Sequence, residues 1–183
     1  ESKMKTILNK KVLLCILVSN LFVVFAESKN TVQLQIVSGN GEIVSKEYDK
    51  NLDALVLSSP SDAQDTKPQV FAIENLDALT KLKSLTIYFC RGTDYSFISK
   101  AKGLQELTLI GCPIESLEFL ESMTKLRNVY LEIITTTESA KKLSNTKVNM
   151  KKLSSLKEIT VIGQPITVTP KFENLQKKAS LKM

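Results

Sequence analysis

Residues 82–90 read Leu-Lys-Ser-Leu-Thr-Ile-Tyr-Phe-Cys, and residues 104–112 read Leu-Gln-Glu-Leu-Thr-Leu-Ile-Gly-Cys. Both follow the pattern Leu-x-x-Leu-x-Leu-x-x-Cys, with Ile87 in one leucine place, and they lie 22 residues apart. A fixed period of this size means that each unit is one supersecondary element that cannot bury its own apolar side chains. The pattern therefore predicts a solenoid in which successive units stack on a shared core.

Three more copies of the pattern flank these two. They begin at Leu52, Leu126 and Leu156, so the successive intervals are 30, 22, 22 and 30 residues. Insertions in a stacked repeat map to loops or helical turns on one face, because the strand cannot take up extra residues without losing register. We therefore predict about five repeats within residues 52–169. The residues expected in one continuous buried row are Leu85, Leu107, Val129 and Ile159.

Each repeat divides into a strand and a return. Leu107, Thr108 and Leu109 alternate between apolar and polar side chains, which is the period of a strand. Further along the same repeat, Leu117, Leu120 and Met123 are spaced three apart, as in a short helix or a 3-10 turn. The predicted class is α/β: a parallel sheet on the concave face and short helical returns on the convex face.

This pattern resembles the 22-residue repeats of bacterial leucine-rich repeat proteins of the internalin class. The resemblance covers about residues 52–175, and residues 82–131 carry its specific part. It departs from the family at Gly92, at Pro60 and Gln164 in the Asn/Cys position, and at Ile134, where the polar ladder is lost. The resemblance implies a curved scaffold that binds another protein on its concave face and brings no catalytic residue or cofactor.

The two ends of the solenoid are expected to be capped, because an exposed end leaves apolar core and a strand edge open. Residues 31–47 alternate around an Asn40-Gly41 turn and predict a β-hairpin over the first repeat. Residues 170–183 place Phe172 and Leu175 among lysines and predict a closing amphipathic helix. A loop is expected at residues 58–68, and residues 27–183 are expected to form one leucine-rich repeat domain.

The first 26 residues predict an export signal. Met4 is the expected start, three lysines precede an apolar run over residues 12–26, and the run ends in Val-Phe-Ala, a small-residue cleavage site after Ala26. An uncleaved anchor and a lipoprotein modified at Cys15 are the alternatives; Cys15 lies inside the apolar run rather than at its end. We expect an exported bacterial protein that is periplasmic, surface-bound or secreted, without a membrane span in the mature chain.

The composition argues against catalysis. The chain has no histidine, which removes the usual general base and the commonest zinc ligand. Glu106, Glu132 and Glu158 are candidate carboxylates for a glycosidase, but alternating positions on an open strand face do not form the cleft that raises one pKa. We therefore expect no enzyme activity, no metal and no cofactor.

The net charge of +6 raises the question of a nucleic-acid partner. A nucleic-acid site requires a basic stripe interleaved with aromatic residues, and the sequence pattern indicates none. The lysines in the insertions and the C-terminal segment are expected to form a solvated convex face, and nucleic acid is not expected as a partner. Examples are Lys141, Lys142, Lys151, Lys152, Lys177 and Lys178.

Cys90 and Cys112 hold equivalent positions in adjacent repeats. Their backbones should lie about 4.8 Å apart, within the range of roughly 4.4 to 6.8 Å between Cα atoms that a disulfide accepts. An exported protein meets oxidising conditions, which favour the bond. Two packed free thiols that help satisfy turn amides fit the same position, and the sequence leaves both states open.

A partner-binding patch is expected where strand residues project away from the core. Tyrosines beside small polar residues and carboxylates are typical of protein interfaces, whereas scattered exposed apolar residues are also ordinary. The expected apolar patch consists of Tyr88, Ile110, Tyr130 and Ile162, and Glu106 and Glu132 are expected to steer a basic partner. The alternative function is a structural solenoid of the envelope that associates with itself and has no soluble ligand.

Overall fold

The computed structural model describes residues 30–37, 42–58 and 70–183. The expected signal region 1–26, the Asn40-Gly41 turn and nearly all of the loop 58–68 lie outside the described residues. Residues Thr31–Met183 form one compact unit, and the fold described below is that of this unit. Among the described helices, none has both the length and the apolar character needed to cross a bilayer.

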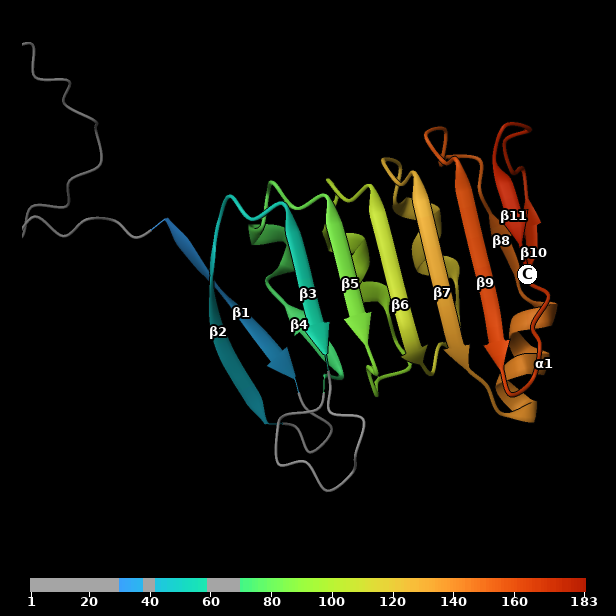
Figure 1. Ribbon diagram of the computed structural model, residues 1–183, viewed down its shortest axis with the longest axis horizontal. Helices are drawn as coiled ribbons and strands as arrows, with labels where there is room; N and C mark the ends of the chain where they lie inside the picture. Colours follow the sequence, from blue (N-terminus) through green and yellow to red (C-terminus); the bar gives the residue numbers. More distant parts are fainter. Residues whose placement is uncertain (1–29, 38–41, 59–69) are drawn as a thin grey trace, which may run out of the picture. The chain divides into compact units, whose positions relative to one another are not determined.

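Six parallel strands form the main sheet, side by side in the order β11-β9-β7-β6-β5-β3 (Figure 1). Each repeat supplies one strand, because its leucine and β-branched residues alternate with polar ones. With few helices beside a mostly parallel sheet, the fold is of the α/β class. The strands are β3 (Ala54–Ser58), β5 (Ser84–Tyr88), β6 (Glu106–Cys112), β7 (Asn128–Ile134), β9 (Glu158–Gln164) and β11 (Ser180–Lys182).

The register of the main sheet stacks equivalent repeat positions directly opposite one another. The predicted buried row is confirmed, since each of its four side chains is at most 3% exposed. A second buried row lies two residues further along the strands and is formed by Leu57, Ile87, Leu109, Leu131 and Val161. The first row runs Leu55, Leu85, Leu107, Val129 and Ile159.

Short helices cover the buried side of the sheet, where the return segments were predicted (Figure 1). Phe97, Ile98, Phe119 and Leu120 turn inward from two of them, and η2 packs against both η1 and η3. The 30-residue interval after Leu126 accommodates α1, the one α-helix among the described residues, which begins with a capping box at Thr136 and Ser139. The helices are η1 (Leu76–Ala78), η2 (Ser96–Lys100), η3 (Glu118–Ser122) and α1 (Thr137–Asn145).

Two smaller sheets lie outside the main one. Strand β1 pairs antiparallel with β2 across the range of the expected hairpin, and it also pairs antiparallel with β4, which the sequence did not predict. Leu34 and Ile36 of β1 are buried in the common core. Strands β8 and β10 pair in parallel. The bounds are β1 (Thr31–Val37), β2 (Ile43–Asp49), β4 (Ala72–Glu74), β8 (Lys147–Asn149) and β10 (Lys171–Glu173).

The expected amphipathic helix at residues 170–183 is wrong. This segment forms β10 and β11 instead, and β11 extends the main sheet by pairing with β9. Leu181 lies 22 residues after Ile159 and directly opposite it, so the repeat period continues into the tail. A strand satisfies the backbone groups along the edge of β9, which a helix cannot do.

In this repeat the inward polar position is occupied by Thr135 and not by Ile134, where it was expected. A bulge between Ile110 and Cys112, at Gly111, brings Cys112 opposite Ile133, and Ile134 is 42% exposed. Thr135 is buried; its hydroxyl donates to the Ile166 carbonyl at 2.9 Å and accepts from the Ile166 amide at 3.0 Å. The polar ladder is therefore shifted by one residue in this repeat, not lost.

Candidate functional site

The outer face of the main sheet, opposite the helices, presents three rows of side chains across its central strands. The register places residues of the same row directly opposite one another on neighbouring strands. The start row is Ser84, Glu106, Asn128 and Glu158; the middle row is Thr86, Thr108, Tyr130 and Thr160; the end row is Tyr88, Ile110, Glu132 and Ile162.

Tyr88 and Ile110 are brought together in the end row. They are direct partners on β5 and β6, and both are partly exposed. The Tyr88 ring also lies near that of Phe89, with the ring centroids 6.4 Å apart. The pair forms a small apolar surface with one aromatic side chain that is half-buried in the free protein.

Tyr130 and Ile162 are placed differently from the expected single patch. Tyr130 lies in the middle row between Thr108 and Thr160, so it is a diagonal neighbour of Ile110. Diagonal neighbours in a sheet remain within reach of an aromatic side chain. In the end row, Glu132 separates Ile162 from Ile110. The structure thus assembles Tyr88, Ile110 and Tyr130 and leaves Ile162 beyond a carboxylate.

The three glutamates of this face do not converge. Glu106 and Glu158 lie in the start row on either side of Asn128, and Glu158 forms an ion pair with Lys182 of β11. Glu132 lies in the end row. Carboxylates spread over an open sheet in this way do not form a paired acid and base.

Three hollows on the described surface lie away from Tyr88, Ile110 and Tyr130. One of about 330 Å³ is lined by residues of η2, η3 and their flanking turns, among them Asp94, Ser96 and Glu118, and another lies beside β4 and η2. A third, of about 120 Å³, lies between residues of β1, β2 and β3 and reaches the outer face at Val56. Tyr88, Ile110 and Tyr130 line none of these three hollows. A flat surface of this kind is suited to a macromolecule and not to a small ligand, which requires a concave site.

Sequence reasoning missed one exposed apolar residue on this face. Val56 of β3 is 64% exposed and lies opposite Thr86, so it extends the middle row toward the first repeat. The alternation of Leu55, Val56 and Leu57 was the available signal, because the two flanking leucines point inward and the residue between them must point outward.

Cys90 and Cys112 are free and buried in the structure. The Cys112 thiol lies 3.4 Å from the Ile110 carbonyl oxygen, and the Cys90 thiol lies 3.8 Å from the Phe71 carbonyl oxygen. Each thiol can donate to its carbonyl. Among the described residues, the buried Tyr95 hydroxyl has no hydrogen-bond partner at regular geometry, and it interacts with both thiols.

The thiol cluster predicts alkaline destabilisation. Burial raises the pKa of Cys112 to about 11, from an ordinary value of 9.0, and burial also raises the pKa of Cys90 and Tyr95. The folded state therefore retains protons that the unfolded chain releases. The contribution of these groups to the free energy of unfolding is fully present below about pH 9 and is lost as the pH rises through the folded-state pKa. For Cys112 we expect the free energy of unfolding to fall between pH 9 and 11 by about 1.4 kcal/mol per pH unit, and the raised pKa values of Cys90 and Tyr95 act in the same direction.

Urea unfolding at pH 8, 9, 10 and 11 measures this fall in stability. The variant with Cys90→Ala and Cys112→Ala removes the two titrating thiols, and its pH slope between 9 and 10 should be shallower than that of the parent. An identical slope in the two proteins would contradict the assignment. In denatured parent protein without residues 1–26, and therefore without Cys15, the number of titratable thiols distinguishes two free cysteines from a disulfide.

Comparison with known proteins gives one structural likeness. An internalin from Listeria monocytogenes str. 4b F2365, solved as a crystal structure, is similar to this chain at 14% sequence identity and a TM-score of 0.25. The match covers 77% of this chain and 63% of the internalin chain, so this chain spans less than two thirds of that protein's length. No protein-family model and no curated protein matches the sequence.

Proposed function

We propose that this chain is an exported, internalin-like leucine-rich repeat module that binds another protein through the outer face of its main sheet. In this proposal the repeats form a solenoid, the outer face is its concave side, and β1 and β2 cap its first repeat. Tyr88, Ile110 and Tyr130 are the anchors, and Glu106 and Glu132 favour a partner with a basic surface.

The adjacency of Tyr88 and Ile110 on β5 and β6 carries this proposal. An interface core needs apolar and aromatic side chains that lie together, since a few buried anchors supply most of the binding energy. The threonines of the middle row have short side chains, so a partner surface can approach the anchors closely. Glu132 lies beside Ile110 and places a negative charge at the rim of the patch.

Affinity capture with the purified protein as bait, from envelope and host extracts, tests the proposal. A variant with Tyr88→Ala and Tyr130→Ala should lose at least about tenfold in affinity for the captured partner, because anchor residues typically contribute 2 kcal/mol or more. The matched control is Tyr48→Ala. Tyr48 is a partly exposed tyrosine on β2, outside the outer face, and its removal should leave binding unchanged.

Thermal unfolding of all three proteins checks that the fold is retained. Equal capture by the parent, the double variant and the control would rule out the outer face as the binding surface. If nothing is captured and the protein instead associates with itself as its concentration rises in sedimentation experiments, the alternative of a structural envelope solenoid gains support. The strand β11 at the sheet edge, with all three residues exposed, supplies a surface for such association.

A further inference from the structure

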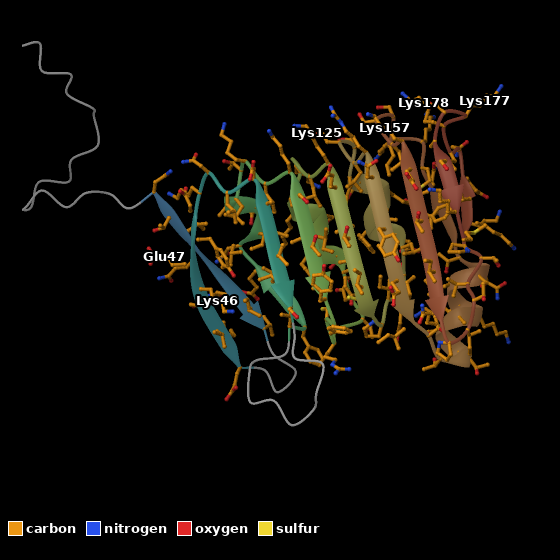
Figure 2. All side chains as sticks on the ribbon, in the orientation of Figure 1. Lys46, Glu47, Lys125, Lys157, Lys177 and Lys178 are labelled. Carbon is orange, nitrogen blue, oxygen red and sulfur yellow. The ribbon has the colours of Figure 1, made fainter. Side chains whose placement is uncertain are left out.

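The edge of the main sheet where the strands begin is lined with basic side chains. In the repeats of β5, β7, β9 and β11, lysine or arginine immediately precedes or follows the first position of the repeat pattern. Figure 2 shows Lys125, Lys157, Lys177 and Lys178 along this edge. We call the following six residues the basic rim: Lys81, Lys83, Lys125, Arg127, Lys157 and Lys177.

Backbone hydrogen bonds hold part of the basic rim in register. The amide of Arg127 donates to the carbonyl of Gln105, the amide of Gln105 donates to the carbonyl of Lys83, and the amide of Lys157 donates to the carbonyl of Arg127. These residues therefore follow the same spacing as the strands, about 4.8 Å for each step across the sheet. Over the six strands the edge extends for about 24 Å.

The side chains of the basic rim are available for binding. All six residues are exposed, and among the residues that the structure describes none of the six forms an ion pair. The ion pairs that do form use Lys142, Lys147 and Lys182, which lie outside the rim. Exposed and unpaired lysines can meet an external anion without first breaking an internal contact.

Basic residues outnumber carboxylates at this edge. For each of the six strands, a window consists of the five residues up to and including the first residue of the strand. Together the six windows contain nine basic residues and three carboxylates, which are Asp53, Glu106 and Glu158. Of these carboxylates, Glu158 is already paired with Lys182. The five residues that follow each of the four central strands, β5, β6, β7 and β9, include only Arg91, Glu115 and Glu138 as charged residues. The positive potential is therefore concentrated where the strands begin.

This placement corrects the expectation from sequence. Lys177 and Lys178 were expected on a solvated convex face, but they lie in the turn before β11, at the same edge as the lysines before the other strands. The stripe is invisible in the sequence because its members come from different repeats, which are 20 or more residues apart. Only stacking of the repeats brings them into one line.

We propose that the basic rim binds a linear anionic polysaccharide, with its sulfate, phosphate or carboxylate groups contacting successive lysines. A polymer that carries anionic groups at regular intervals matches the regular spacing of cations along the rim. The acidic groups on the surface of a folded protein are not spaced regularly. This site borders the start row of the protein-binding face at Glu106, but it does not depend on that proposal.

The composition of the edge distinguishes this ligand from nucleic acid. The six windows contain no Phe, Tyr or Trp, so no platform is present on which bases can stack. Eight of the nine basic residues are lysines, which act as hydrated point charges and lack the planar fork of arginine that reads bases. Four of the five leucines within the windows are buried, and the fifth, Leu52, packs partly buried against the core, so the edge offers little apolar surface to a bilayer.

Titration of the protein with heparin, as a sulfated polysaccharide probe, at several salt concentrations tests the proposal. The rim variant carries Lys125→Gln, Arg127→Gln and Lys157→Gln. The matched control carries Lys46→Gln, Lys100→Gln and Lys141→Gln, which removes the same charge from exposed positions away from the rim. Circular dichroism should be the same for all three proteins.

We expect the rim variant to bind heparin at least about tenfold more weakly at moderate salt, and its slope of log affinity against log salt to fall by about three. The control should differ from the parent by less than about twofold in the same titration. Equal losses in the two variants would overturn the proposal, because they would reflect net charge alone. So would an absence of heparin binding, or oligo(dT) of matched charge binding as tightly through the rim, which would assign the rim to nucleic acid.

Discussion

Replacing Leu107 by alanine should lower the free energy of unfolding by about 2 to 5 kcal/mol, the usual cost of truncating a leucine in a packed core. Leu107 is 1% exposed and lies opposite Leu85 on one side and Val129 on the other. Its truncation therefore leaves a cavity in the middle of the buried row, where neighbours on both strands are held in register and cannot collapse into it. Urea denaturation monitored by circular dichroism measures the loss.

The matched control is Thr108→Ala, one residue further along β6. Thr108 points to the outer face, where it is partly exposed between Thr86 and Tyr130. Its replacement should change stability by no more than about 0.5 kcal/mol, as for most surface substitutions. Similar losses for the two variants would mean that the alternation of buried and exposed residues along β6 is wrong.

Replacing Gly111 by alanine should destabilise the protein by about 2 to 4 kcal/mol, through backbone strain and overpacking together. Gly111 has φ of 64°, a conformation that residues with a side chain adopt only with strain. A Cβ added there would lie 2.6 Å from the Cδ1 atom of the Phe89 ring. The bulge that this glycine permits sets the register between Cys112 and Ile133, so its loss also disturbs the pairing of β6 with β7.

Gly103→Ala provides the control for Gly111→Ala. A Cβ at Gly103 would lie 3.1 Å from the Leu82 carbonyl oxygen, and Gly103 does not have a positive φ. A shift of a few tenths of an ångström accommodates it, so the change should stay within about 1 kcal/mol. Thermal or urea unfolding compares the two variants. A Gly111→Ala protein as stable as the Gly103→Ala protein would contradict the bulge.

The strands of the central repeats could be predicted because their signal is local and repeated. Leu85, Leu107 and Val129 alternate with polar residues and recur at one period, so each strand supports the assignment of the next. Gly92 departs from this pattern for a reason that only the structure gives. A Cβ there would lie 2.2 Å from the Phe71 carbonyl oxygen, so the close approach of another segment excludes a side chain.

The errors concern features that depend on contacts between distant segments. The tail was expected to be helical because Phe172 and Leu175 lie among lysines, yet the open edge of β9 offers backbone partners that favour a strand. The pairing of β1 with β4 joins residues that are far apart in sequence, and no local pattern indicates it. Thr135 was missed because the bulge at Gly111 moves the inward position by one residue.

The candidate site was predicted in its parts and not in its arrangement. The outward direction of Tyr88, Ile110 and Tyr130 followed from the strand period. Their distribution over two rows, and the position of Glu132 between Ile110 and Ile162, required the register between strands. The basic rim required the same register. The two proposed binding surfaces therefore depend on one structural feature, the stacking of equivalent repeat positions.

Methyl NOE spectroscopy on a sample with labelled Leu, Val and Ile methyl groups tests this stacking most directly. We predict NOEs that join Leu85 to Leu107, Leu107 to Val129 and Val129 to Ile159, since each pair lies directly opposite on adjacent strands. Leu85 and Ile159 are three strands apart, about 14 Å, and should show none. Missing NOEs between the neighbouring pairs, or a direct NOE between Leu85 and Ile159, would contradict the ladder on which the fold and both proposed surfaces depend.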